Sequence, residues 1–513
     1  MCEQKKLWVK IKGIDMDLEA WGLIRLFFND DSVIYINDET ENDNFTPGPF
    51  LQVSVCDEEI WHCKAEYYSK LEKYEMHEDI ESYNIKPQYS SKKQISADDM
   101  NKPGRSLLKS RKIIVGASIV EVLSKVTGKQ LPYGSLTGVR PVKLAMHCID
   151  DGLDKPGTIK HLVNTTNMTK EKATLLYDVA AVERPFINVD HKSVHLYIGI
   201  PFCKSRCLYC SFTSYPVGRY KNLIPGFLDA LEKEIRYVAK MVKENNQIVK
   251  SVYIGGGTPT SLDNSAINRV LQLVNELFDI KNVEFTFEAG RPDTINEEKL
   301  ITIKANNVTR ISINPQTMNL STLKAIGRNH TPEEIIEKLN MSRDIGFTNI
   351  NMDVIAGLPN EDVEMFRYTM SQIEKLAPDS LTVHTMSIKR ASTLHENIDS
   401  YRLAPDNIVE SMLDNARISA EYMGMRPYYL YRQKNILANL ENTGYSKAGY
   451  ECIYNIHTME EVQSIYAMGA GAISKFVSPD GKKIKRSYNV KEVAQYINRI
   501  DEMLERKRAI MLI

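Results

Sequence analysis

The chain has 513 residues, which is too long for one typical hydrophobic core, so we expect about two to four domains. Charged residues make up 26% of the sequence and the formal net charge is −1, so the composition excludes the basic surface typical of nucleic-acid-binding proteins. The first 20 residues lack the apolar core of a signal peptide, and no apolar run approaches the roughly 18 residues that span a bilayer, so we expect a soluble cytoplasmic protein.

Residues 1–75 are predicted to form a small α+β domain. The pattern of residues 18–28 favours a helix. Alternating apolar residues and runs rich in β-branched and aromatic side chains indicate strands over 7–11, 32–36 and 50–55.

Residues 76–190 are predicted to be a polar linker followed by a mainly helical region. The linker, over about 78–111, is charged and contains Lys-Pro and Pro-Gly turn signals. A helix is predicted over 170–182.

Residues 191–390 alternate between strand-like and helical patterns. Apolar residues at helical spacing predict helices over 224–235 and 267–277, the second behind a capping Asp263. The strands are predicted over 194–201, 251–255, 283–289, 308–315, 348–356 and 380–388. Such alternation indicates a parallel sheet covered by helices, although periodicity does not distinguish a barrel from a doubly wound sheet. Residues 391–513 are predicted to be a helical and irregular substrate-side region.

Three cysteines, Cys203, Cys207 and Cys210, directly follow the first of these strands. Three thiolates can bind three irons of a cubane [4Fe–4S] cluster and leave the fourth iron open, whereas full structural ligation uses four cysteines. Catalysis needs such an open metal position, as catalytic zinc sites also show. A partial zinc knuckle or a chance cluster of buried cysteines are the alternatives, but no His or fourth Cys follows at zinc spacing.

The spacing Cys-x3-Cys-x2-Cys resembles the signature of the radical S-adenosylmethionine (SAM) superfamily. The wider segment, 197–212, is similar to the oxygen-independent coproporphyrinogen III oxidase family, and to its HemZ-type branch in particular. The resemblance implies that the α/β region is an incomplete (β/α)6 barrel, flanked by an N-terminal α+β and helical region and a C-terminal helical region. It also implies a [4Fe–4S] cluster, held by the three cysteines, that cleaves SAM to a 5′-deoxyadenosyl radical.

Further residues at the predicted strand ends match the family's SAM-binding positions. Consecutive glycines after the second strand allow close approach of a ligand, although a tight turn would need them equally. A buried charge such as Asp353 has to be paired or functional, and the fork of Arg328 suits a carboxylate, although a surface arginine is the ordinary alternative. The residues that the resemblance assigns to SAM are Tyr197, Gly256, Gly257, Thr258, Glu288, Gln316, Arg328 and Asp353.

The resemblance implies a porphyrinogen substrate with four propionates, for which arginines, lysines or main-chain donors are needed. Arg140 and Arg432 are the predicted substrate residues, with Arg426 and Lys434 as further candidates. For each of these four residues, a solvated surface charge is the ordinary alternative interpretation.

Two positions depart from the characterised oxidases. The oxidases have another cysteine where this chain has Phe212, and a histidine where it has Gly199. The phenylalanine is shared with the family's haem-chaperone branch.

Three hypotheses follow. The first is oxidative decarboxylation of coproporphyrinogen III to protoporphyrinogen IX, with a low-potential ferredoxin or flavodoxin as the electron donor implied by the family. The second is a haem-binding chaperone, for which His195, His384 and His457 are candidate axial ligands. The third is a radical enzyme that acts on another substrate.

Overall fold

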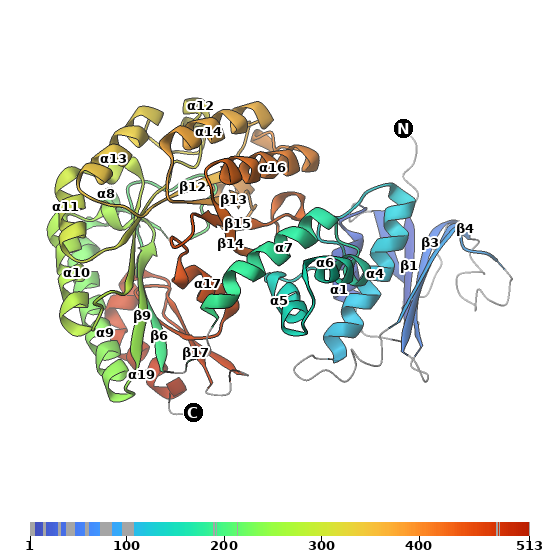
Figure 1. The fold of residues 1–513 in the computed structure, drawn as a ribbon, viewed down its shortest axis with the longest axis horizontal. Helices are drawn as coiled ribbons and strands as arrows, with labels where there is room; N and C mark the ends of the chain where they lie inside the picture. The colour runs from blue at the N-terminus through green and yellow to red at the C-terminus, as the bar shows by residue number, and fades with distance from the viewer. Residues whose placement is uncertain are drawn as a thin grey trace. The chain divides into compact units, whose positions relative to one another are not determined.

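The computed structural model describes residues 6–13, 17–28, 32–36, 47–56, 61–71, 85–94, 107–187, 190, 192–212, 214–478, 481 and 483–511. The chain forms two compact units, Met1–Tyr177 and Asp178–Ile513. Figure 1 shows the elements of both units. None of the helices in this described part of the chain is long and apolar enough to cross a membrane.

The first unit contains a five-stranded sheet with the strand order β2-β1-β3-β4-β5. Its strands are β1 (Leu7–Lys12), β2 (Val33–Ile36), β3 (Gly48–Cys56), β4 (His62–Leu71) and β5 (Tyr89–Gln94). Strand β1 runs parallel to both of its neighbours, and β3, β4 and β5 pair antiparallel. Helices α1 (Asp17–Ile24) and α4 (Leu107–Thr127) contribute Ile24, Val115 and Ile119 to the same apolar core as Val9 and Leu51 of the sheet.

Most elements predicted for this unit are confirmed, but the linker prediction is partly wrong. Residues Tyr89–Gln94 form strand β5, which pairs with β4. The strand is polar because it lies at the sheet edge, so no alternation of apolar residues reveals it. The end of the predicted linker, residues 107–111, instead begins helix α4, and the linker residues 78–84 and 95–106 lie outside the described residues.

The predicted helical segment that follows is confirmed. After α4 it contains α5 (Val142–Asp150), α6 (Lys155–Thr166) and α7 (Lys170–Glu183), the last of which matches the helix predicted over 170–182.

The second unit is organised around six parallel strands, and all six were predicted. They are β6 (Ser193–Ile200), β9 (Ile248–Gly256), β10 (Glu284–Gly290), β11 (Arg310–Ile313), β12 (Ile350–Ala356) and β13 (Ser380–Thr385). Each pairs in parallel with the next along the chain. This unbroken order within one sheet agrees with the implied (β/α)6 arrangement.

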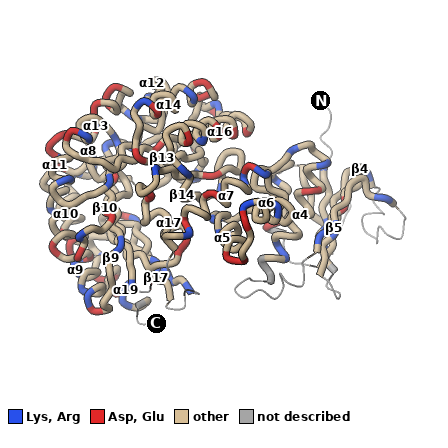
Figure 2. The backbone as a smooth tube through the Cα atoms, in the orientation of Figure 1, with Lys and Arg blue, Asp and Glu red and all other residues tan. Residues whose placement is uncertain are grey.

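Helices lie in an arc outside these strands (Figure 1). They are α9 (Ile224–Glu244), α10 (Asn264–Leu277), α11 (Glu297–Ala305), α12 (Leu320–Ala325), α13 (Pro332–Asp344), α14 (Val363–Leu376) and α16 (Asp406–Tyr422). The predicted cap is confirmed, because Asp263 accepts a hydrogen bond from the Ala266 amide at 2.8 Å. Lys and Arg alternate with Asp and Glu along these helices (Figure 2), in keeping with the near-zero net charge.

The C-terminal region differs from the prediction, because it adds five strands to the sheet. They are β14 (Arg426–Tyr431), β15 (Asn442–Ser446), β16 (Ser464–Met468), β17 (Ile473–Val477) and β18 (Ile484–Tyr488). Strand β15 pairs antiparallel with β13, and β16 pairs in parallel with β6. These short runs resemble buried helix segments in sequence, and only their tertiary pairing distinguishes the two. The region also contains helices α15 (Thr393–Glu396), α17 (Ile453–Glu460), α18 (Val493–Asn498) and α19 (Ile500–Met511).

A buried ion pair joins α19 to α9. Glu234 and Lys507 are 0% and 1% exposed and their charged atoms are 2.6 Å apart. Glu234 also accepts hydrogen bonds from the Gly469 amide and the Tyr496 hydroxyl. Gly469 packs directly on the carbonyl of Gly199 in β6, so the network fixes the strand that leads to the cysteines.

Candidate active site

A pocket of about 660 Å³ opens at the carboxyl ends of the six parallel strands. In sheets of this kind the carboxyl ends of the strands carry the functional residues. The pocket brings together every residue predicted for the cluster and for SAM: Tyr197, Cys203, Cys207, Cys210, Gly256, Gly257, Thr258, Glu288, Gln316, Arg328 and Asp353.

The cysteine loop is anchored to distant parts of the unit. The Leu208 amide donates to the Ile326 carbonyl at 3.1 Å, and the Leu208 carbonyl accepts from the Leu394 amide at 3.0 Å. Burial raises the pKa of Cys203 to about 11 and also raises that of Cys210. The protein alone therefore favours protonated thiols, and bound metal would be needed to stabilise the thiolates.

The glycine turn packs directly against the cysteines. A Cβ atom on Gly257 would lie 2.6 Å from the Phe202 carbonyl oxygen and 2.9 Å from the Cys203 sulfur, so only glycine fits. Gly256 has a φ of +109°, which side chains rarely adopt. The Thr258 hydroxyl lies 3.6 Å from the Cys203 sulfur.

The Glu288 side chain lies at the end of β10, where it accepts a hydrogen bond and has a raised pKa. The Tyr253 hydroxyl donates to its Oε1 at 2.6 Å, and the Tyr253 ring stacks near Tyr197 with a centroid separation of 6.2 Å. Burial raises the pKa of Glu288 to about 7; the Tyr253 bond opposes this shift and the charge of Asp353 adds to it. The carboxylate also accepts a main-chain hydrogen bond from Gly256, which favours its ionised form.

Gln316 and Arg328 carry buried polar atoms that face the pocket without partners. Gln316 has a φ of +68°, and its main chain bonds Asp353 and Ile355 of β12. Neither its Oε1 nor the Nε of Arg328 has a hydrogen-bond partner among the described residues. A strained backbone together with orphaned polar atoms is typical of a site that a ligand completes.

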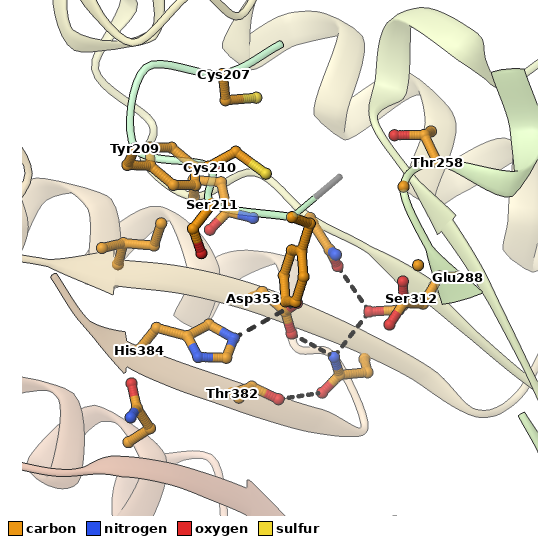
Figure 3. A pocket seen from close by; sticks show the side chains of 18 of the residues that line it. Cys207, Tyr209, Cys210, Ser211, Thr258, Glu288, Ser312, Asp353, Thr382 and His384 are labelled. Carbon is orange, nitrogen blue, oxygen red and sulfur yellow. Dashed lines mark hydrogen bonds and ion pairs between the residues drawn. The ribbon is translucent and has the colours of Figure 1, made fainter. Parts of the chain in front are cut away.

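Asp353 contacts Asn351 of its own strand and His384 of the neighbouring strand β13 (Figure 3). Asn351 donates to its Oδ1 at 2.7 Å, and His384 lies 3.8 Å from its Oδ2. Burial would raise the pKa of Asp353, but the bonds from His384, Asn351 and Thr382 outweigh this effect and lower the pKa. Figure 3 also shows Cys207 and Cys210 on the loop across the pocket from His384.

These features fit a cluster and a polar cofactor such as SAM. The glycine turn at the pocket has no room for a Cβ atom. Gln316 and Arg328 line the same pocket and each has a polar atom without a partner among the described residues, and the carboxylates of Glu288 and Asp353 line it as well. Across the described ranges, no three His, Cys, Asp or Glu side chains converge on a point where one ion could bind. In a cubane cluster each thiolate binds a different iron, so the three cysteine sulfurs need not converge on a single point.

The predicted substrate residues lie elsewhere. Arg140 belongs to the first unit, and Arg432 is buried, with its guanidinium donating to the Asn439 carbonyl at 2.9 Å. Neither lines the pocket, nor do the exposed Arg426 and Lys434. Phe212, one of the two departures, lines the pocket and is 70% exposed.

Sequence reasoning missed several lining residues. Arg291 pairs with Asp293 at 3.0 Å, and its Nη1 lies 3.9 Å from the Cys207 sulfur. Its position three residues after Glu288 was an available signal. Tyr429 and Tyr431 of β14 also line the pocket. His384 of β13, which the sequence indicated only as a candidate haem ligand, lines it too.

Comparison with known proteins supports this picture. Residues 197–373 match the model of the radical SAM superfamily. The chain is 43% identical over 395 residues to the oxygen-independent coproporphyrinogen-III oxidase-like protein HemZ of Bacillus subtilis, covering 76% of this chain and 78% of that protein. It is 28% identical over 310 residues to the heme chaperone HemW of the same organism, covering 60% and 76%.

A solved structure is also similar. The coproporphyrinogen III oxidase HemN of Escherichia coli, a radical SAM enzyme, has a TM-score of 0.50 and 25% identity, covering 63% of this chain and 73% of that chain. A [4Fe–4S] cluster and SAM are the cofactors of the superfamily, and the pocket has the residues for both. The chain thus belongs to the radical SAM superfamily and, within it, to the oxygen-independent coproporphyrinogen III oxidase-like family of the HemZ type.

Proposed function

We propose that the protein converts propionate side chains of coproporphyrinogen III to vinyl groups without oxygen. The observation that carries this proposal is that the predicted cofactor residues share their pocket with a second wall. Strands β13 and β14 and the segments that follow them supply this wall: His384, Ser387, Lys389, Tyr429, Tyr431 and Gln433. Aromatic faces and polar tips suit a large tetrapyrrole with carboxylate arms.

Each propionate loses one hydrogen atom, which the radical abstracts, and then releases carbon dioxide and one electron. The bond to the carboxylate breaks, the vinyl double bond forms, and the electron passes to an external one-electron acceptor. When bound, the cluster and SAM supply hydrogen abstraction through a 5′-deoxyadenosyl radical. We assign cluster binding to the three cysteines, and cofactor positioning to Glu288, Asp353 and the orphaned groups of Gln316 and Arg328. The electron that restores the cluster would come from a low-potential ferredoxin or flavodoxin.

The two tyrosines of the second wall contribute neutral, hydrogen-bonding side chains. Burial raises the pKa of Tyr431 to about 12 and also raises that of Tyr429, so both phenols stay protonated at neutral pH. They can therefore pack against the macrocycle without adding negative charge near its propionates.

The test is anaerobic reconstitution with iron and sulfide, followed by incubation with SAM, dithionite and coproporphyrinogen III. We expect 5′-deoxyadenosine together with a vinyl-bearing product, and neither from Cys207→Ala protein. Deoxyadenosine without a changed porphyrinogen would reject the substrate and retain a radical enzyme.

A haem chaperone is the second candidate, because exposed Phe212 lines the pocket and HemW is among the relatives. His195 and His457 are poor axial ligands here, since both are buried and their ring nitrogens lie 2.7 Å apart in a closed network. His384 lines the pocket and is the remaining candidate ligand. Haem titration would support this function if a Soret band forms with wild-type protein and is lost with His384→Ala.

A further inference from the structure

We infer that Lys389 is the anchor for a substrate carboxylate at the second wall of the pocket. The inference rests on the proposed function, and it names the group that recognises a propionate other than the one that reacts.

Four cationic side chains line the pocket, and three of them are already engaged. Arg291 forms an ion pair with Asp293, and both side chains are 3% exposed. The buried Arg310 donates to the Tyr450 carbonyl and to the Ser380 hydroxyl, each at 2.6 Å. Arg328 lies on the cysteine side of the pocket and donates to the Asn314 carbonyl.

Lys389 makes fewer contacts than these arginines, and it is the one of the four cations that belongs to the second wall. Its ammonium donates to the Lys434 carbonyl at 3.0 Å and forms no ion pair with any carboxylate in the described ranges. An ammonium has three donors, so two remain for a ligand. Burial lowers the pKa of Lys389, which indicates that water solvates the cation incompletely and that a bound anion would be favoured.

The backbone around Lys389 is rigidly built. The Ile388 amide donates to the Asn435 carbonyl at 3.0 Å, and the Ser387 hydroxyl donates to the Lys434 carbonyl at 3.1 Å. These bonds tie the segment after β13 to the segment after β14. The ammonium is therefore presented from a fixed frame and not from a freely moving surface loop.

The two carboxylates of the pocket are occupied by other groups. Glu288 accepts from Tyr253, and Asp353 from Asn351. Lys389 is thus the pocket cation left to neutralise a charged arm of the substrate, and Gln433 offers an amide on the same wall. An anchored propionate would orient the macrocycle and direct another propionate to the cofactor.

The experiment measures binding of coproporphyrin III, the stable oxidised analogue, by fluorescence titration in the absence of SAM. We expect Lys389→Met to weaken binding about tenfold, as for loss of a charge-assisted hydrogen bond. Lys389→Arg is expected to stay within about threefold of wild type. Arg390→Met is the matched control, because Arg390 is the next residue, is exposed and does not line the pocket.

The tetramethyl ester of coproporphyrin III, in the same buffer, removes the carboxylates from the ligand. It should bind wild-type and Lys389→Met protein equally. Equal coproporphyrin binding by wild type and Lys389→Met, or equal weakening by Met and Arg, would overturn the inference. Unchanged SAM affinity in Lys389→Met protein confirms that the pocket is folded. If that affinity falls, coproporphyrin binding by Lys389→Arg and Lys389→Gln protein is compared, and equal binding by these two variants would overturn the inference.

Turnover of coproporphyrinogen III tests the proposed function separately. Lys389-dependent binding without turnover would keep the anchor and reject the oxidase. Turnover with an unchanged KM in Lys389→Met would keep the oxidase and reject the anchor.

Discussion

Replacing Glu288 by Gln should make the stability of the cofactor-free protein less dependent on pH. The pKa of Glu288 rises from 4.5 to about 7 on folding, chiefly through burial. Because the folded pKa of this acid is raised, the unfolded chain loses its proton first. Glu288 therefore destabilises the fold progressively as the pH rises from about 4.5 to 7.

The size of the effect follows from the shift. A difference of about 2.5 pKa units, at about 1.4 kcal/mol each, sets an upper limit of about 3.5 kcal/mol. Glu288 is partly exposed, so solvent screening reduces the figure to about 2 kcal/mol. Glutamine keeps the shape and an acceptor for Tyr253 but does not ionise.

The assay is denaturant unfolding of cofactor-free wild-type and Glu288→Gln protein between pH 5 and 8. The difference in unfolding free energy should shift by about 2 kcal/mol in favour of the variant across this range. SAM affinity of the reconstituted variant should fall at pH 8, where the wild-type carboxylate is ionised. A stability difference that does not change with pH would refute the reasoning.

Three further predictions follow from the same structure. Lys507→Met leaves the Glu234 carboxylate buried without its ion-pair partner, so it should lower the unfolding free energy by about 3–5 kcal/mol. The double variant with Glu234→Gln should recover much of this loss, and a double variant that is equally unstable would contradict the ion-pair argument. Gly257→Ala should prevent stable cluster assembly, read as iron content and visible absorbance, since its Cβ would collide with Phe202 and Cys203; normal iron content would show that the turn can shift. In cofactor-free protein at pH 8, Cys203 should alkylate about a hundredfold more slowly than an ordinary cysteine, because its pKa is raised from 9.0 to about 11, and mass spectrometry of the labelled peptides measures this rate.

The parallel strands were predictable because each is buried on both faces and reads as a short apolar run. Strand β6, for example, is buried along almost its whole length. The polar residues that interrupt or end such runs, as Asp353 and Glu288 do, then identify the edge where chemistry takes place. The resemblance supplied their grouping, and the pocket agrees with it.

Other parts could not be predicted for physical reasons. The polar edge strand β5 and the short strands β14 to β18 depend on partners far away in sequence. Arg432 looked like a substrate residue because it lies in a Tyr-rich segment, but its guanidinium turns to Asn439. Lys389 carries no motif, and its significance depends on which neighbouring charges are already paired.

The predicted cofactor residues and the second wall lie in different parts of the sequence, and this explains why the cofactors were easier to infer than the substrate. The match to the superfamily ends at residue 373, whereas the second wall begins with His384 and continues to Gln433. The cysteines and the residues predicted to bind SAM belong to the shared β/α repeats, which many chemistries use. Strands β13 and β14, with the segments that follow them, form much of the rest of the pocket, so substrate choice within the family should depend on residues beyond the shared motif. Variants of His384 and Lys389 should therefore separate oxidase from chaperone activity, while variants of the cysteines would remove the radical chemistry without distinguishing substrates.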